Sequence, residues 1–476
     1  MSSAGSSVAA ASAAVVTGVL YALSLDIGPF GALALVAPIP VLLLALGDAS
    51  ARRVALTAAA ARLIGCAGLV YAYGGTIPTA VLIVMALLLT AHFTSAVLLA
   101  RWCARRLPSW LAVFAFAIFA AALEFLMLLP APDGTFGAMG YALVDILPLA
   151  QLASVGGVAA LTFLAGFVPM ALAVLLRRRR EWRSIAVAAG VPLAFVLVFG
   201  AWRLAQPYER SVRVGLAAID ELTLQALQGD DAAAEVAQRY AMVLAAFESQ
   251  DLDFIVLPER MFADRADEIA AGSAPLLAAA NALDVTIVAG FDETLADGRH
   301  ANTARLFTPT GNWSSYAKRR LIPGLEANLV PGDRPMVIDG VGVAICKDMD
   351  FPRMIREYGR EGATLMLVPA WDFVVDGRLH SRMAVLRAIE NGFAMARAAA
   401  SGRLTVNDAY GRIVAEAVTT PSAPAVLTAE VGLTSLVRPL YVRIGDLFAW
   451  LTVAGALVLV ALCRVCGRVP RDEQAR

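Results

Sequence analysis

Long apolar stretches dominate the first two hundred residues of the chain. Most of them approach or exceed the roughly 20 residues that a helix needs to cross a bilayer core, at about 1.5 Å per residue. Seven such stretches occur there, at residues 8–24, 28–47, 54–72, 78–100, 110–130, 153–176 and 184–202. The pattern predicts seven membrane-spanning helices, and a further apolar run at 446–463 predicts an eighth.

Between the seventh and the eighth stretch, short apolar runs alternate with amphipathic segments. Strands are expected at 212–218, 254–257, 285–290, 303–307, 341–345, 364–368 and 404–406, and helices at 232–249, 265–283, 352–361 and 381–399. Such alternation is typical of an α/β fold. We therefore expect a membrane domain at 1–207, an α/β domain at 208–440, and a last span with its tail at 441–476.

Composition agrees with a membrane protein. Of the 476 residues 59% are hydrophobic, and the mean hydropathy is +0.69, whereas soluble proteins have about 45–50% apolar residues. The formal net charge is zero, so nothing points to a nucleic-acid partner. Only two of the 39 basic residues are lysines, Lys318 and Lys347. A chain that otherwise uses arginine has a chemical reason to place lysine, which is a compact and tunable donor or base.

The distribution of arginine predicts the orientation of the spans. Arginines follow the second, fourth and sixth stretches, at positions 52, 53, 101, 105, 106 and 177–180, whereas the loops after the first, third and fifth carry only acids. Basic loops stay in the cytoplasm. We therefore expect both termini in the cytoplasm and the 208–440 domain on the outer face of the membrane.

Charged side chains also lie within the predicted spans. Arg62 lies in the third span and Glu124 in the fifth. Because charges in hydrocarbon are costly, they are usually paired or functional. An Arg62–Glu124 ion pair is the simplest expectation, and its role remains open between fixing helix packing and serving a site.

A candidate nucleophile lies in the sequence VGVAICKDMDFP, residues 341–352. An apolar run, expected to be a buried strand, ends abruptly at Cys346, which Lys347 and Asp348 follow. A nearby cation favours the thiolate, the reactive form of cysteine. A buried structural cysteine followed by solvated charges is the competing interpretation.

Two other stretches carry matching chemistry. The apolar run 254–257 ends at Pro258 and presents Glu259, and ligand-binding groups of α/β sheets commonly follow strand ends. Lys318 lies eight residues before Glu326, with a Pro-Gly loop between them. Taken singly, each of these charges reads as a solvated surface residue.

Taken together, strand-Glu, then Lys, then strand-Cys resembles the nitrilase superfamily over roughly residues 212–420. The resemblance implies a four-layer αββα sandwich and a triad of Glu259 as general base, Lys318 as oxyanion stabiliser and Cys346 as nucleophile. It suggests that Glu326 positions the base or the substrate. Lys347, Asp348 and Trp371 complete the set of candidate supporting residues.

Membrane spans before such a domain and one span after it resemble the apolipoprotein N-acyltransferase family. The resemblance includes Glu124 and the following loop with Gly134, and covers nearly the whole chain. It implies acyl transfer from a phospholipid, through a cysteine thioester, to the amine of a diacylglyceryl-cysteine lipoprotein. It implies no metal or organic cofactor, and a location in the bacterial cytoplasmic (inner) membrane.

The sequence departs from that family in two places. The nucleophile is followed by Lys347-Asp348, where Tyr-Glu is usual. The family carries a tryptophan shortly after the first strand of the domain, whereas this chain has residues 220–222, Asp-Glu-Leu, there. These departures keep open a membrane-tethered amidase, or an acyltransferase with another acceptor. A scaffold or transporter that has lost activity is a third hypothesis.

Overall fold

The computed structural model describes residues 3–24, 28–219, 232–265, 273–420, 422, 424–435 and 438–466. The chain divides into two compact units. The first, here called the membrane unit, contains Met1–Ala131, Gly137–Leu204 and Ile444–Arg476. The second, here called the α/β unit, contains Pro132–Phe136 and Ala205–Arg443. The short segment Pro132–Phe136 was expected in the membrane domain, but it packs as part of the α/β unit. The segment 220–222 lies outside the described residues.

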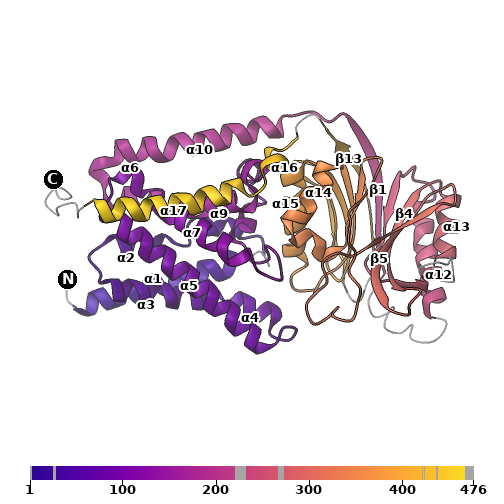
Figure 1. Cartoon of the computed structure of the whole chain (residues 1–476), viewed down its shortest axis with the longest axis horizontal. Coiled ribbons are helices and arrows are strands. Elements are labelled where there is room, and N and C mark those ends of the chain that lie inside the picture. Colours follow the sequence, from indigo (N-terminus) through magenta and orange to yellow (C-terminus); the bar gives the residue numbers. More distant parts are fainter. Residues whose placement is uncertain are drawn as a thin grey trace. The chain divides into compact units, whose positions relative to one another are not determined.

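Within the described residues, seven helical segments of the membrane unit are long and apolar enough to cross a bilayer. Its α-helices are α1 (Ser3–Ser24), α2 (Ile39–Leu46), α3 (Ala51–Gly65), α4 (Ala67–Tyr73), α5 (Thr79–Ala104), α6 (Ser109–Ala112), α7 (Ala115–Leu128), α8 (Leu147–Ala150), α9 (Ala153–Arg177), α10 (Trp182–Leu204) and α17 (Leu447–Val465). Short 3-10 helices lie at η1 (Gly31–Leu35), η2 (Met139–Leu143) and η3 (Arg179–Glu181). Figure 1 shows these helices in indigo to pink, with α17 in yellow.

The predicted second span differs from the structure. Residues 28–47 form the 3-10 helix η1 and the eight-residue helix α2, and Pro38 and Pro40 lie at the start of α2. A proline removes a backbone donor and suits the first turn of a helix rather than its interior. The combined stretch Gly31–Leu46 is therefore shorter than the seven long helices, although it is equally apolar in character.

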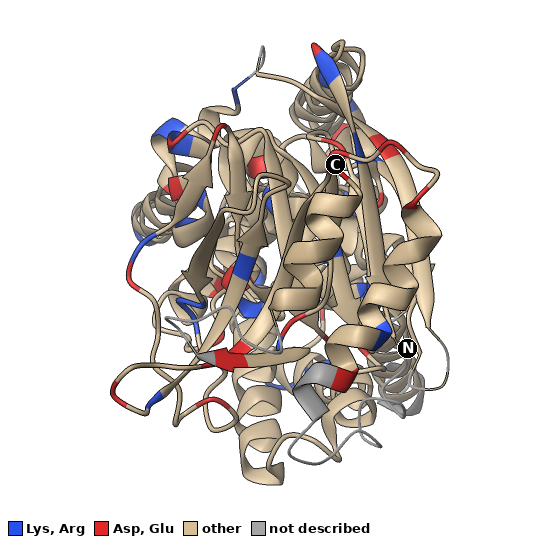
Figure 2. Cartoon of the chain, turned by 90° about the vertical axis from the view of Figure 1, so that its right-hand side faces the viewer, with Lys and Arg blue, Asp and Glu red and all other residues tan. Residues whose placement is uncertain are grey.

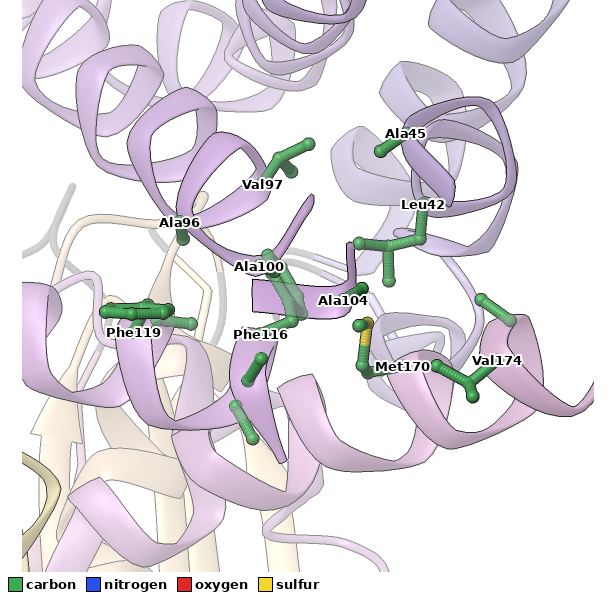
Figure 3. Packing of buried hydrophobic residues seen from close by; sticks show 14 of the residues in the cluster. Leu42, Ala45, Ala96, Val97, Ala100, Ala104, Phe116, Phe119, Met170 and Val174 are labelled. Carbon is green, nitrogen blue, oxygen red and sulfur yellow. The ribbon is translucent and has the colours of Figure 1, made fainter. Parts of the chain in front are cut away.

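Small residues let the helices of the membrane unit pack closely. Ala96, Ala100 and Ala104 recur along one face of α5, and Figure 3 shows them among side chains of α2, α7 and α9. On α9, Gly166 lies against α7, where an added Cβ would be 2.9 Å from the Cα of Ala117. Close backbone approach of this kind favours association of membrane helices, because van der Waals packing drives it.

Several of the loop arginines bind the carbonyl end of α2. Arg177 Nη2 donates to the Leu43 carbonyl at 2.7 Å, and Arg105 Nη2 donates to that of Gly47 at 3.0 Å. The buried Arg101 guanidinium donates to the carbonyls of Ala45 and Ala49. These bonds satisfy carbonyls that have no partner within the helix.

The predicted Arg62–Glu124 ion pair is not formed. Both side chains line one cavity of about 30 Å³, but the ion pairs among the described residues do not include them. Arg62 Nη1 contacts Cys66 Sγ at 3.7 Å and its guanidinium lies 5.4 Å from the centre of the Tyr21 ring. Glu124 Oε2 instead accepts from the Met139 N–H at 2.9 Å, so its carboxylate binds the 3-10 helix η2.

The α/β unit contains two sheets. The first has the order β13-β1-β2-β4-β5-β6, with β3 paired to β4, and the second has the order β12-β11-β10-β9-β8-β7. The strands are β1 (Arg210–Ala218), β2 (Phe254–Val256), β3 (Phe262–Arg265), β4 (Thr286–Thr294), β5 (His300–Phe307), β6 (Trp313–Ala317), β7 (Met336–Ile338), β8 (Val341–Val343), β9 (Leu365–Trp371), β10 (Ala394–Ala400), β11 (Arg403–Asn407), β12 (Ile413–Val418) and β13 (Ala425–Leu433).

Two helical layers cover the sheets, as Figure 1 shows. The helices are α12 (Ala232–Leu244), α13 (Ala274–Ala282), α14 (Pro352–Arg360), α15 (Gly377–Asn391) and the short α16 (Leu440–Ile444), with η4 (Ala245–Phe247) and η5 (Cys346–Asp350). Side chains of both sheets, such as Val214 and Leu367, form the central core. A second core joins the first sheet to α12 and α13. The predicted fold class, a helical membrane domain plus a four-layer αββα sandwich, is confirmed.

Two predicted helices are wrong in extent. The helix expected at 381–399 ends at Asn391, because Gly392 adopts φ +80° and closes it, and residues 394–400 form strand β10. Of the helix expected at 265–283, Arg265 belongs to strand β3, residues 266–272 lie outside the described residues, and α13 covers Ala274–Ala282. Strands β3, β6, β7, β10, β12 and β13 were not predicted.

Charges of both signs are distributed through the described part of the α/β unit. Figure 2 shows Lys and Arg interspersed with Asp and Glu along its strands, helices and loops. This distribution agrees with the zero net charge of the whole chain.

Candidate active site

Cys346 begins a tight 3-10 turn directly after a buried strand. β8 runs through Val343, and Ala344 and Ile345 continue the buried apolar segment to the thiol. Cys346 has φ +40°, which is unusual for a residue with a side chain. Its Sγ lies 3.4 Å from the carbonyl oxygen of Trp371, at the end of the neighbouring parallel strand β9. The turn therefore presents the thiol at the carboxyl ends of two adjacent strands.

A buried ammonium lies between two carboxylates. Lys318 follows β6, its side chain is fully buried, and its Nζ is 2.7 Å from Glu259 Oε1 and 2.9 Å from Glu326 Oε2. Both glutamates are also buried, with about 4% of each side chain exposed. Buried charges are tolerated when opposite charges and hydrogen bonds compensate them. The structure thus brings Glu259 to Lys318 and Glu326, which lie 59 or more positions further along the chain.

Asn302 joins the two carboxylates and was not predicted. From strand β5, its Nδ2 donates to Glu259 Oε1 at 2.6 Å and to Glu326 Oε1 at 2.7 Å. Its carbonyl accepts from the Lys318 N–H at 2.8 Å. Asn302 lies just before the predicted strand 303–307, in the run HANTARLF, and no sequence signal separates it from the other polar residues there.

Glu259 is fixed by its backbone as well as by its side chain. Its N–H donates to the Ala370 carbonyl of β9 at 3.2 Å, which links the first sheet to the second. The neighbouring Gly290 N–H donates to the Pro258 carbonyl at 3.0 Å. A Cβ at Gly290 would clash with the Cα of Glu259, so only glycine permits this approach.

Asp348 holds the cysteine turn against the lysine segment. Its Oδ2 accepts from Tyr316 Oη at 2.7 Å and from the Ile345 N–H at 3.1 Å, while Oδ1 accepts from the N–H groups of Arg319 and Arg320. Burial raises the pKa of the Asp348 carboxyl to about 6, although these donors act in the opposite direction. The candidate supporting residue Asp348 is therefore a structural link between Cys346 and Lys318.

The pKa of the Cys346 thiol does not follow the expectation from its neighbouring cation. Burial raises this pKa well above its usual value, the charge of Glu259 raises it further, and Lys318 only partly opposes both. Burial alone would lower the pKa of Lys318, but Glu259 and Cys346 outweigh it and raise that pKa. For Glu326, Lys318 overcomes burial and holds the pKa below its usual range. The resting site therefore holds a neutral thiol and a charged lysine.

The other two predicted supporting residues have different surroundings. Lys347 Nζ is 2.7 Å from Asp133 Oδ1 and 3.7 Å from Asp350 Oδ2, so carboxylates match its charge. Trp371 contributes its carbonyl to Cys346, and its side chain is 38% exposed. The next residue, Asp372, forms a two-pronged buried ion pair with Arg397 of β10.

The described residues contain no group of three or more His, Cys, Asp or Glu side chains arranged to hold a metal ion. The charged groups that act on the Cys346 thiol include the Lys318 ammonium and the Glu259 carboxylate.

Two protein-family models match the chain, one in each unit. The carbon-nitrogen hydrolase model matches residues 221–438, and the model of the apolipoprotein N-acyltransferase N-terminal domain matches residues 17–171. The α/β unit is thus a carbon-nitrogen hydrolase domain attached to a membrane unit. A solved nitrilase-superfamily structure from Saccharomyces cerevisiae aligns with a TM-score of 0.41 and 24% identity, covering 48% of this chain and 92% of that one.

Relatives along most of the chain identify the family. The apolipoprotein N-acyltransferase of Rhodopseudomonas palustris is 31% identical, and that of Geobacter metallireducens is 28% identical, each over 69% of this chain and 69% of the relative. An (R)-stereoselective amidase from a Pseudomonas species is 33% identical over 24% of this chain and 43% of its own length. The chain belongs to the apolipoprotein N-acyltransferase family.

Proposed function

We propose that this protein transfers an acyl chain from a phospholipid to the N-terminal amine of diacylglyceryl-cysteine lipoproteins, through a thioester on Cys346. The observation that carries the proposal is the buried set of Glu259, Lys318 and Cys346 within a chain whose membrane unit also matches this family. No metal or organic cofactor is needed for this chemistry.

The first half-reaction acylates the thiol. Because the Cys346 thiol is neutral at rest, a base must take its proton; of the carboxylates that act on the thiol Glu259 acts most strongly, while Asp372 is paired with Arg397. The thiolate attacks the ester carbonyl of the phospholipid. Lys318 is placed to stabilise the oxyanion that forms, together with a backbone N–H of the turn. Collapse breaks the ester C–O bond, and the alkoxide of the lysophospholipid leaves with the proton held by Glu259.

The second half-reaction returns the enzyme to its starting state. The lipoprotein amine attacks the thioester carbonyl, and Glu259 accepts a proton from the attacking nitrogen. Collapse of the second tetrahedral intermediate forms the amide bond and breaks the C–S bond. The sulfur regains its proton, so the thiol is restored. Glu326 and Asn302 hold Glu259 and Lys318 in place throughout both steps.

The substrates of this reaction are lipids, so the proposal includes a location in the bacterial inner membrane. The long apolar helices of the membrane unit support that location. We further propose that both termini are cytoplasmic and that the α/β unit lies on the outer face. The arginines clustered around the end of α2 support the assignment of that end to the cytoplasmic side.

The test uses purified protein and phospholipid vesicles without acceptor. Intact-mass measurement is expected to show one acyl adduct that hydroxylamine removes, and Cys346→Ala is expected to show none. A variant with the other four cysteines replaced by alanine serves as the matched control and is expected to keep the adduct. Addition of a diacylglyceryl peptide is expected to move the acyl group to its free amine, while an N-acetylated peptide leaves the adduct in place.

The second candidate is a membrane-tethered amidase, or an acyltransferase with another acceptor. The similarity to the Pseudomonas amidase and the residues Lys347-Asp348 after the nucleophile favour it. Failure to form an adduct, combined with ready alkylation of Cys346 and hydrolysis of small amides, would replace the first proposal with this one.

A further inference from the structure

The backbone of the cysteine turn is strained and depends on its surroundings. Cys346 holds φ +40°, a conformation that costs free energy for a residue with a Cβ and persists only where neighbouring contacts impose it. Asp348 supplies such contacts from the side of the lysine segment. The other side of the turn, around Lys347 and Asp350, is held by a different part of the chain.

That part is the segment 133–136, which we call the 133–136 strap. Thr135 donates from both its N–H and its Oγ1 to the Asp350 carbonyl, at 2.9 and 3.0 Å. Gly134 has φ +61°, and a Cβ there would clash with the same carbonyl oxygen. The strap therefore lies directly on the backbone of the last residue of the turn.

Side chains extend this attachment on both flanks. Asp133 Oδ1 lies 2.7 Å from Lys347 Nζ, and only 10% of the Lys347 side chain is exposed. The ring of Phe136 stacks on His380, with 5.9 Å between ring centres. His380 in turn pairs with Asp376 at 3.0 Å, so the strap is joined to the start of α15 as well.

We propose that Asp133 and Thr135 are positioning residues for the reaction, and that the 133–136 strap holds the Cys346 turn in its reactive conformation by pairing with Lys347 and Asp350. The inference rests on the proposed function of Cys346 as nucleophile. In sequence the strap follows α7 of the membrane unit, 210 residues or more before the cysteine, yet it packs within the α/β unit. Lys347 acts as an attachment point here, because Asp133 and Asp350 already match its charge.

The test is a double-mutant cycle with Asp133→Asn, Lys347→Met and both together in the full chain. We expect each single change to slow single-turnover acylation of Cys346 at least tenfold while leaving KM for phospholipid within twofold. The double variant is expected to be no slower than the slower single one, because both changes remove one contact. Lys347→Arg keeps the charge and is expected to retain at least a third of the rate.

A second readout needs no lipid substrate. Alkylation of Cys346 by iodoacetamide across pH is expected to change in rate and midpoint when the strap is released, and Thr135→Val is expected to give a milder change of the same kind. Glu416→Gln is the control. Glu416 lies on the edge strand β12, away from the turn, and forms ion pairs with Arg382 and Arg403, so this change breaks a comparable cluster. It is expected to lower the melting temperature without altering either rate per folded molecule.

Three results would overturn the inference: an Asp133→Asn variant that acylates and alkylates like the wild type, losses that multiply in the double variant, or equal losses in Glu416→Gln. If the variants fold too poorly to assay, Thr135→Val decides alone by its alkylation profile. A wild type that forms no thioester contradicts the proposed function instead, and the alkylation profiles still decide whether the strap positions the turn.

Discussion

Strand β5 carries two buried polar clusters on opposite faces of one sheet, and each contains one cation and two carboxylates. On the face toward the second sheet, Asn302 binds Glu259 and Glu326, which enclose Lys318. On the face toward the helices, Arg305 pairs with Asp264 at 3.1 Å and with Glu293 at 2.7 Å. Both cations are fully buried.

The two clusters differ in how many neighbouring groups contact the cation. The Arg305 guanidinium lies between the rings of Phe291 and Trp313, at 4.8 and 4.7 Å, and also donates to Ser273. Its planar fork and both of its faces are occupied, which suits a structural role. Lys318 is a compact point charge, and both it and its partner Glu259 also act on the Cys346 thiol. One cation and two carboxylates therefore stabilise the fold on one face of the sheet and take part in the proposed reaction on the other.

The substitution Lys318→Arg tests most directly whether the two clusters differ in role, because it keeps the charge but enlarges the head group. We expect thioester formation to fall by about 10²–10³-fold or more, because the oxyanion donor is displaced from its position. Single-turnover acylation followed by intact mass measures the effect. A rate within tenfold of the wild type would show that position 318 requires only a positive charge.

The reciprocal change, Arg305→Lys, is expected to act on stability. It removes the ring contacts and leaves Asp264 or Glu293 without a full partner, for a loss of about 2–4 kcal/mol in the free energy of unfolding. Thermal unfolding in detergent measures that loss. The acylation rate per folded molecule should stay unchanged, and a reduced rate would place Arg305 in the reaction.

Asn302→Leu tests whether the amide that joins Glu259 to Glu326 is needed for the reaction. The change leaves each carboxylate without one donor. We expect the barrier to acylation to rise by about 1–3 kcal/mol, which corresponds to roughly a 10–100-fold loss in acylation rate. Thr303→Val on the same strand is the matched control. The Thr303 hydroxyl is buried and forms no hydrogen bond, so its replacement by a methyl group should leave the acylation rate unchanged and should not lower stability.

His380 provides a third cluster, in which the cation itself titrates. Burial alone would lower the pKa of His380, but Asp376, then Asp350 and Asp372, outweigh burial and raise that pKa to about 9. Its contribution to stability is therefore fully present below about pH 6.5 and is lost as pH rises through 9. We expect a loss of about 1–3 kcal/mol over that range. Unfolding measured against pH should show a flatter profile for His380→Gln, and parallel profiles would contradict the assignment.

Dense apolar strands were predictable from the sequence, whereas exposed or alanine-rich ones were not. β1, β2, β4 and β5 are marked by Val, Ile, Leu and Phe, but β6 reads WSSYA and is partly exposed. β10 reads AMARAAA, and alanine favours a helix by its own propensity. Parallel pairing with β9 over seven residues overrides that propensity.

Within the site, the residues of strongest chemistry were predictable and their connections were not. Glu259 and Cys346 follow recognisable strand ends, Lys318 was one of only two lysines in the chain, and the family resemblance joined the three. Asn302 meets Lys318 because β5 pairs with β6 in one register, with Thr303 opposite Ala317, and no local pattern encodes that register. The contact between Asp133 and Lys347, 214 positions apart, is equally invisible along the chain.

The pairing of β1 with β13 brings together the two ends of the long segment of the α/β unit. Arg210 lies opposite Leu433, and the two strands stay in register as far as Ala218 and Ala425. Ser435 binds Glu209 just outside this ladder, so the chain enters and leaves the domain at neighbouring points about 5 Å apart. A segment with such adjacent ends can be exchanged between relatives with two short joints, and the 133–136 strap, which comes from elsewhere in the chain, has to be exchanged with it.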